Sequence, residues 1–107
     1  MIPVELKTIL DEHPLTLLYF STPTCNVCKV LRPRVEALLE EEPPWYFQYM
    51  NTDESMEIVG QHLIFAVPTL LLMADWREVA RLSRHFGMRE LEQPVRRYAK
   101  FFNQAES

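Results

Sequence analysis

Two thiols have the clearest capacity for chemistry in this chain. Cys25 and Cys28 are its only cysteines among 107 residues, and both lie in the stretch FSTPTCNVCKVLRP, Phe20 to Pro33. A cysteine pair at this spacing can hold a metal ion, form a redox-active disulfide, or be buried as two inert thiols. Which alternative applies depends on the elements that position the pair.

A metal site finds little support in the rest of the sequence. Structural zinc takes four ligands, and a single CxxC motif supplies two of them. The three histidines, His13, His62 and His85, are scattered along the chain and show no ligand spacing. The sequence therefore predicts no metal ligands and no cofactor.

The cysteine pair lies where a predicted strand meets a predicted helix. Leu15–Ser21 is a nearly unbroken apolar run, which is typical of a strand buried on both faces. Apolar residues then recur at three- and four-residue spacing, which predicts a helix beginning near Cys25. A helix N-terminus offers unpaired N–H groups and the positive end of the macrodipole, and both lower the pKa of a thiol.

This placement predicts different roles for the two cysteines. Cys25, at the helix start, is the expected nucleophile. Cys28, about one turn deeper and more shielded, is the expected resolving thiol. Their clustering at a strand-to-helix turn in a β-α-β context favours redox chemistry over a metal site or two inert thiols.

Hydrophobic periodicity predicts the element order α-β-α-β-α-β-β-α. Pro33 and Pro94 fall inside two of the helices and are expected to bend them. Val79 and Leu82 do not share the parity of a regular strand, so the register of the fourth strand stays open. The predicted elements are a helix from near Pro3 to His13, a strand Leu15–Ser21, a helix from Cys25 to about Glu42, a strand Trp45–Asn51, a helix beginning at Asp53, strands Thr69–Met73 and Glu78–Phe86, and a helix Met88–Phe102.

The connections between these elements predict a mixed sheet. The first two strands are joined through a helix, so they should be parallel with a right-handed crossover. The last two are joined by a tight turn at 74–77, so they should form an antiparallel hairpin. The expected fold class is α/β: one domain, residues 1–107, with a mixed four-stranded sheet flanked by helices on both faces.

Composition and charge argue against other classes of function. The formal net charge of −4 argues against nucleic acid as a partner, because phosphate contact needs a basic excess. The longest apolar run, Leu63–Ala74, is too short to span a bilayer and is broken by Pro68. The charged N-terminal stretch does not match a signal peptide. The expectation is a cytoplasmic protein with no membrane partner.

Several short motifs lie in a specific order along the chain: Cys25-Asn26-Val27-Cys28, Lys29 directly after this motif, Pro33, Asn51-Thr52-Asp53, and Val67-Pro68-Thr69. Together they resemble the thioredoxin family, and the resemblance extends from about Leu15 to Phe102. The resemblance implies a thioredoxin-like fold whose N-terminal edge strand is missing here. It also implies a thiol-disulfide oxidoreductase that acts on protein disulfides and whose own disulfide is reduced again by a thioredoxin reductase or another dithiol.

The resemblance also assigns supporting residues. It implies a cis peptide bond before Pro68, in a loop that packs against the disulfide. The backbone of Val67 would pair with an extended substrate, and Pro33 would kink the active-site helix. The residues expected to border the cysteines and support them are Thr24, Asn26, Val27 and Lys29.

Several positions depart from the family pattern. Asn26-Val27 replaces the usual Gly-Pro, and Thr24 replaces a tryptophan. Tyr19 and Tyr49 stand where the family keeps a buried aspartate and its lysine partner, and we interpret them as core packing. The expected consequences are a redox poise different from that of ordinary thioredoxin, and a slower or more selective reduction of disulfides. Cys28 would lose its proton to water, to its exchange partner, or to another group.

Two other functions are weighed against the leading one. A binding or redox-sensing adaptor with little general reductase activity would agree with the lost charged pair, although both cysteines and both family prolines are intact. A glutaredoxin-like protein is disfavoured because Met73-Ala74-Asp75-Trp76 replaces that family's glycine pair. Phe65 and Trp76 are candidate contacts for a partner, with core and turn packing as the favoured alternatives.

Overall fold

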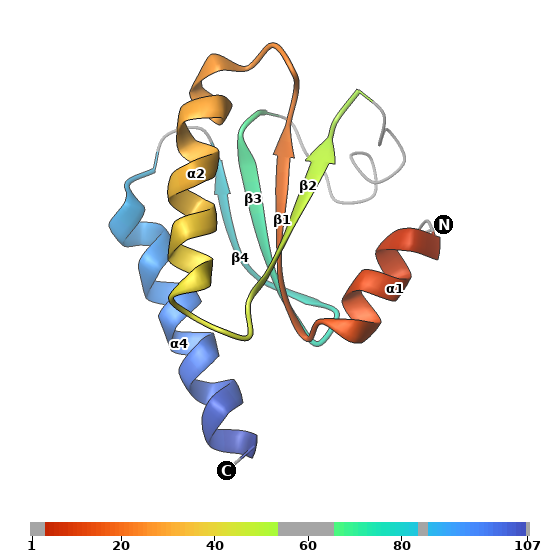
Figure 1. Ribbon diagram of the computed structural model, residues 1–107, viewed down its shortest axis with the longest axis vertical. Helices are drawn as coiled ribbons and strands as arrows, with labels where there is room; N and C mark the ends of the chain where they lie inside the picture. Colours follow the sequence, from red (N-terminus) through yellow and green to blue (C-terminus); the bar gives the residue numbers. More distant parts are fainter. Residues whose placement is uncertain (1–3, 54–65, 84–85, 107) are drawn as a thin grey trace.

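The computed structural model describes residues 4–53, 66–83 and 86–106. The helix predicted to begin at Asp53 falls largely outside these residues, as does Phe65. The remaining predicted elements are all present, with ends that shift by a few residues. They are α1 (Val4–Glu12), β1 (Leu15–Ser21), α2 (Asn26–Glu40), β2 (Tyr46–Asn51), β3 (Thr69–Ala74), β4 (Arg77–Ser83) and α4 (Met88–Glu106) (Figure 1).

The four strands form one mixed sheet in the order β2-β1-β3-β4. β1 is parallel to β2, with Tyr19 opposite Tyr49, and antiparallel to β3, with Phe20 opposite Thr69. β3 and β4 form the expected antiparallel hairpin. The predicted mixed sheet is confirmed, and within the described residues β2 is an edge strand, without the first strand that the family resemblance would add.

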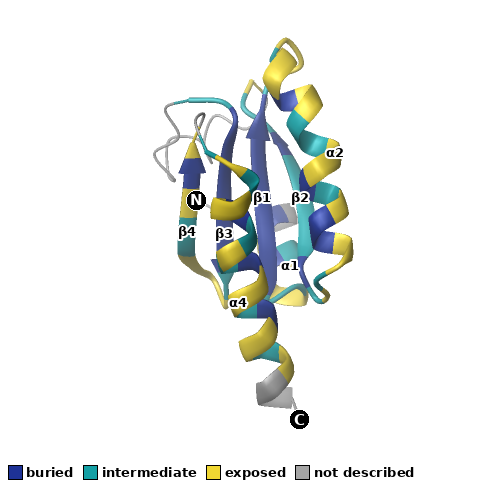
Figure 2. Ribbon diagram, turned by 90° about the vertical axis from the view of Figure 1, so that its left-hand side faces the viewer, coloured by how far each residue is buried: buried dark blue, intermediate teal, exposed yellow. Residues whose placement is uncertain are grey.

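β1 lies at the centre of the sheet and is buried over its whole length. Leu17 and Tyr19 belong to the core beneath α2 and α4, whereas Leu18 and Phe20 pack with Leu6 of α1. Figure 2 shows α2 and α4 on one side of the sheet and α1 on the other. Because side chains alternate between the faces, a strand covered on both sides must be apolar at nearly every position.

A β-bulge in β4 explains the parity that the sequence left open. Leu72 pairs with Ala80 and Met73 pairs with Glu78, so Val79 is an extra residue between the two pairs. The extra residue shifts the alternation along the strand. Val79 and Leu82 therefore both contribute to the core beneath α2 and α4.

Both internal prolines lie inside continuous helices. α2 runs through Pro33 and α4 runs through Pro94. Proline has no N–H to donate, so each helix lacks one intrahelical hydrogen bond at that point. The bend expected at each position stays a prediction. No helix in the described ranges is long and apolar enough to cross a membrane.

The double-sided burial of β1 gives a stability prediction. Leu18 is 0% exposed, so Leu18→Ala should lower the free energy of unfolding by about 2–5 kcal/mol through lost burial and a cavity. Val30→Ala, at a residue 63% exposed, should change it by less than about 0.5 kcal/mol. Denaturant unfolding of the oxidised proteins measures both. Equal effects from the two variants would contradict the described packing.

Candidate active site

The candidate site forms where β1 ends and α2 begins. Ser21 is the last residue of β1, and the N–H of Cys25 donates to the Thr22 carbonyl oxygen at 3.1 Å, which closes the turn between the two elements. Cys25 is the N-cap of α2, with an extended backbone (φ −81°, ψ 102°). The strand-to-helix junction therefore places the first cysteine at the helix start, as the sequence predicted.

The sulfur of Cys25 caps the helix. Its Sγ accepts a hydrogen bond from the Cys28 N–H at 3.2 Å, the position in which a serine or aspartate oxygen usually caps a helix. The two cysteines form a disulfide with their Cα atoms 5.3 Å apart, so the protein is in its oxidised form. A negative charge on Cys25 after reduction would face this N–H and the positive end of the α2 macrodipole.

The two sulfur-bearing residues differ in access. Cys25 is half-buried, whereas Cys28 is 2% exposed and belongs to the core. A partner sulfur can therefore approach Cys25 more readily than Cys28. This asymmetry is the one that a nucleophile and a resolving thiol require.

The segment Val67-Pro68 lies at the same end of the sheet. Its peptide bond is cis, as the resemblance implies. Thr69 opens β3 opposite Phe20 near the end of β1, so the residues just before it lie beside the β1–α2 junction. The Thr69 hydroxyl donates to the Ala66 carbonyl oxygen at 2.6 Å, which closes this segment on itself.

The remaining predicted site residues surround the disulfide at the surface. Val27 is 62% exposed in the first turn of α2, so an apolar side chain faces solvent beside Cys25. Pro33 is also exposed, about two turns after Cys25. The predicted neighbours that are exposed at the start of α2 are Thr24, Asn26, Val27 and Lys29.

Trp76, named from the sequence as a candidate partner contact with turn packing favoured, lies away from this site. It lies in the β3–β4 turn next to Ala74, which pairs with Leu15 at the opposite end of β1. Its indole N–H donates to the Asp11 carboxylate at 2.9 Å. Trp76 therefore packs the turn against α1, the alternative that the sequence favoured.

Tyr19 is the residue whose contribution the sequence did not disclose. Its side chain is 0% exposed, and its hydroxyl donates a hydrogen bond to the Cys28 carbonyl oxygen at 2.6 Å. Burial raises the pKa of Tyr19 to about 12, although the nearby Arg32 opposes this shift. The phenol therefore stays neutral near pH 7, where it can donate a proton in a hydrogen bond but is a poor base. The sequence signal was a hydroxyl-bearing aromatic residue within a strand predicted to be buried on both faces.

An aromatic row continues from Tyr19 to the surface. The Tyr19 ring lies 5.5 Å from that of Phe47 and 6.5 Å from that of Tyr49. The guanidinium of Arg32 lies over both β2 rings, 4.7 Å from the Tyr49 centroid and 5.2 Å from the Phe47 centroid. It also pairs with the Glu36 carboxylate at 3.0 Å. Arg32 thus covers the outer side of the row by cation–π contact.

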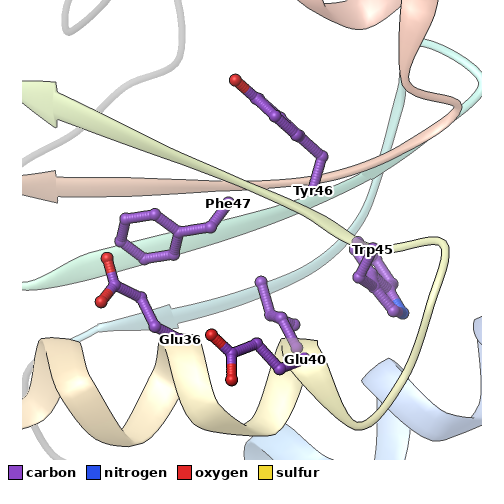
Figure 3. Close-up of a pocket in the computed structure, with 6 residues that line it drawn as sticks. Glu36, Glu40, Trp45, Tyr46 and Phe47 are labelled. Carbon is purple, nitrogen blue, oxygen red and sulfur yellow. The ribbon is translucent and has the colours of Figure 1, made fainter.

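A hollow of about 470 Å³ lies elsewhere, between the second half of α2 and the start of β2. Figure 3 shows Glu36 and Glu40 on the α2 side and Phe47 on the β2 side. Neither cysteine lines this hollow. Among the described residues, no group of three or more His, Cys, Asp or Glu side chains could hold a metal ion.

The sequence profile of the thioredoxin family matches residues 5–97. This chain belongs to the thioredoxin family. With its paired cysteines, it is a thiol-disulfide oxidoreductase of that family, and the resemblance noted in the sequence is confirmed.

Relatives and solved structures agree with this assignment. The chain is 29% identical over 99 residues to the thioredoxin-like protein YdfQ of Bacillus subtilis, covering 92% of this chain and 88% of that protein. It is 30% identical over 86 residues to a Chlamydia trachomatis thioredoxin, covering 80% and 81%. The structure of Fasciola hepatica thioredoxin matches at 27% identity with a TM-score of 0.74, covering 85% and 91%. A mutant thioredoxin of Halobacterium salinarum, 24% identical, shares the fold with a TM-score of 0.82 over 92% and 87%.

The raised pKa of Tyr19 gives a pH prediction. Because the pKa rises from 10.0 to about 12 on folding, the protonated phenol favours the folded state fully below pH 10, and this contribution is lost as the pH rises towards 12. Arg32 opposes the shift, whereas Tyr49 and Glu36 add to it. Tyr19→Phe should therefore show a shallower alkaline loss of stability than wild type. Denaturant midpoints across this pH range test it, and identical slopes would contradict it.

Proposed function

We propose that this protein, as a single thioredoxin-like domain of residues 1–107, reduces or exchanges protein disulfides through Cys25 and Cys28. One observation carries the proposal: a half-buried Cys25 caps α2 and is joined to a core-buried Cys28. The first cysteine is accessible and faces a helix N-terminus, and the second is within bonding reach of it. A macromolecular partner suits this surface, since apolar Val27 and the segment before β3 flank the disulfide.

The cycle follows from this asymmetry. The Cys25 thiolate attacks one sulfur of a partner disulfide, and the other partner sulfur leaves with the electron pair and takes a proton from solvent. The deprotonated Cys28 then attacks the Cys25 sulfur, which forms the Cys25–Cys28 bond and releases the second partner thiol. Two electrons pass from the dithiol to the partner. A thioredoxin reductase or another dithiol restores the thiols.

The supporting residues have proposed roles around this cycle. The backbone of Val67 would pair with an extended partner segment beside the disulfide, and cis Pro68 would shape that loop. Pro33 would bend α2 beyond the cysteines. The residues that would border the incoming partner are Thr24, Asn26, Val27 and Lys29. We place the protein in the cytoplasm, where thiols stay reduced between turnovers.

The redox poise is proposed to differ from that of ordinary thioredoxin. Asn26 and Val27 occupy the first turn between the cysteines, and neutral Tyr19 occupies the place of the family's buried carboxylate. Both changes alter the surroundings of the thiolates. The second candidate, an adaptor with little general reductase activity, is favoured by the same loss of the buried carboxylate.

The roles of the two cysteines give a trapping prediction. Cys28→Ser should accumulate a mixed disulfide with a protein substrate, since Cys25 can attack but nothing resolves the product. Cys25→Ser should accumulate far less, because Cys28 is 2% exposed. Non-reducing gel electrophoresis after reaction with a disulfide-bonded protein measures both. Equal trapping by the two variants would contradict the proposed roles, and stronger trapping by Cys25→Ser would reverse them.

Reductase and adaptor differ in the chemistry of the reduced pair. We expect the Cys25 thiol to titrate below the value of about 8.5 for free cysteine, and the Cys25–Cys28 couple to lie between roughly −270 and −120 mV. Insulin disulfides should be reduced, more slowly than by thioredoxin. Titration, equilibration with glutathione and insulin turnover measure these quantities. A Cys25 thiol pKa near about 8.5, together with no disulfide-exchange activity, would favour the adaptor. Insulin turnover at a rate equal to that of thioredoxin would contradict the proposed difference in redox poise.

A further inference from the structure

Besides the hydrogen bonds within the α2 backbone, two side chains contact the backbone of Cys28. Its N–H donates to the sulfur of Cys25 at 3.2 Å, within the first turn of α2. Its carbonyl oxygen accepts the hydroxyl of Tyr19 at 2.6 Å, from the central strand β1. The first contact is local to the helix, whereas the second joins the helix to the sheet. Of these two hydrogen bonds, the second is the one that joins this turn directly to β1.

The strand-to-helix contact matters most after reduction. In the oxidised protein the disulfide also restrains both cysteines. Reduction removes that bond, and in a mixed disulfide the Cys25 sulfur carries the partner instead. The hydrogen bond from Tyr19 involves neither sulfur, so breaking the disulfide does not by itself remove it. We propose that Tyr19 is a positioning residue for the resolving cysteine, holding the first turn of α2 so that the Cys28 sulfur stays aimed at Cys25.

The phenol is itself held rigidly enough for this purpose. Tyr19 lies on the central strand directly opposite Tyr49, with the Phe47 ring 5.5 Å away and no exposed surface. Arg32 covers the outer side of the β2 rings. With its pKa raised to about 12, the hydroxyl keeps its proton over the pH range of thiol exchange, so the hydrogen bond is not lost by ionisation.

The step affected is the resolving one, so this inference rests on the proposed function. The Cys28 thiolate attacks the Cys25 sulfur of the mixed disulfide, the Cys25–Cys28 bond forms, and the partner sulfur leaves with the electron pair. Orientation of the attacking atom governs such an intramolecular step. The preceding attack by Cys25 on the partner is bimolecular and does not involve the Cys28 carbonyl.

A chromogenic aryl disulfide, dithiobisnitrobenzoate, separates the two steps in stopped flow with the reduced protein. The first aryl thiolate is released at a rate proportional to reagent concentration, and the second at a concentration-independent rate set by Cys28. Tyr19→Phe removes only the hydroxyl. We expect it to slow the second release by roughly tenfold, and to leave the first within about twofold.

Tyr49→Phe is the matched control. Tyr49 is the register partner of Tyr19 on β2, and its hydroxyl makes no hydrogen bond within the residues described. We expect this variant to leave both releases unchanged. If Tyr19→Phe lowers the unfolding midpoint but leaves the second release at the wild-type rate, Tyr19 is only a packing residue and the proposal is overturned. If the wild-type protein shows no first release, the proposed function fails instead.

A measurement on the wild-type protein covers the case in which Tyr19→Phe does not fold. A hydrogen-bonded, buried hydroxyl proton exchanges slowly, so NMR should detect the Tyr19 hydroxyl proton close to Cys28. We expect this signal to persist, still close to Cys28, after the disulfide is reduced. Its loss on reduction, while the fold is retained, would overturn the proposal.

Discussion

The burial of β1 on both faces is the constraint on which the rest of the structure depends. Both its edges are paired and both its faces are covered, so water cannot satisfy any polar side chain that it carries. Its three polar groups all find protein partners: Thr16 donates to the His13 carbonyl, Tyr19 to Cys28, and Ser21 to the Thr22 carbonyl. Each bond fixes a junction, respectively the entry from α1, the contact with α2, and the turn towards Cys25. The strand therefore positions the site as well as forming the core.

The position of the disulfide follows from this arrangement. A parallel neighbour on one side and an antiparallel neighbour on the other bring the end of β1 next to the start of β3. The start of α2 and the Val67-Pro68 segment thereby meet at one end of the sheet, although about forty residues separate them in the sequence. In the same core, the indole N–H of Trp45 donates to the Val95 carbonyl at 2.7 Å and joins the residue before β2 to α4. Hydrogen bonds thus link α2 to β1 through Tyr19, and α4 to the start of β2 through Trp45.

Much of this arrangement could be predicted from sequence because it depends on local pattern. The apolar run of β1, the periodicity of α2 and the CxxC spacing each report on neighbouring residues. The parts that could not be predicted depend on contacts between distant segments. The bulge at Val79 is defined by which β3 residues it faces, and the hydrogen bond of Tyr19 depends on how closely α2 approaches β1. Trp76 could only be named as a candidate contact, with turn packing favoured, because sequence proximity to β3 does not say which end of the sheet a turn occupies.

Tyr19 and Tyr49 stand where the family resemblance implies a buried charged pair, so charge lies elsewhere in this protein. Among the described residues, the buried polar side chains of serine and threonine type are Thr16, Ser21 and Thr69, and no carboxylate or amine is buried. An unpaired charge in this position would cost several kcal/mol, so loss of both partners is more favourable than loss of one. The positive charge of Arg32 instead lies on the outer face of Tyr49, paired with Glu36. Among the residues that the structure describes, the interior next to Cys28 then offers a hydrogen-bond donor, the Tyr19 hydroxyl, but no base. We therefore expect the Cys28 thiol to give up its proton to solvent or to the sulfur of the departing partner. The resolving step would then depend on the exchange partner itself.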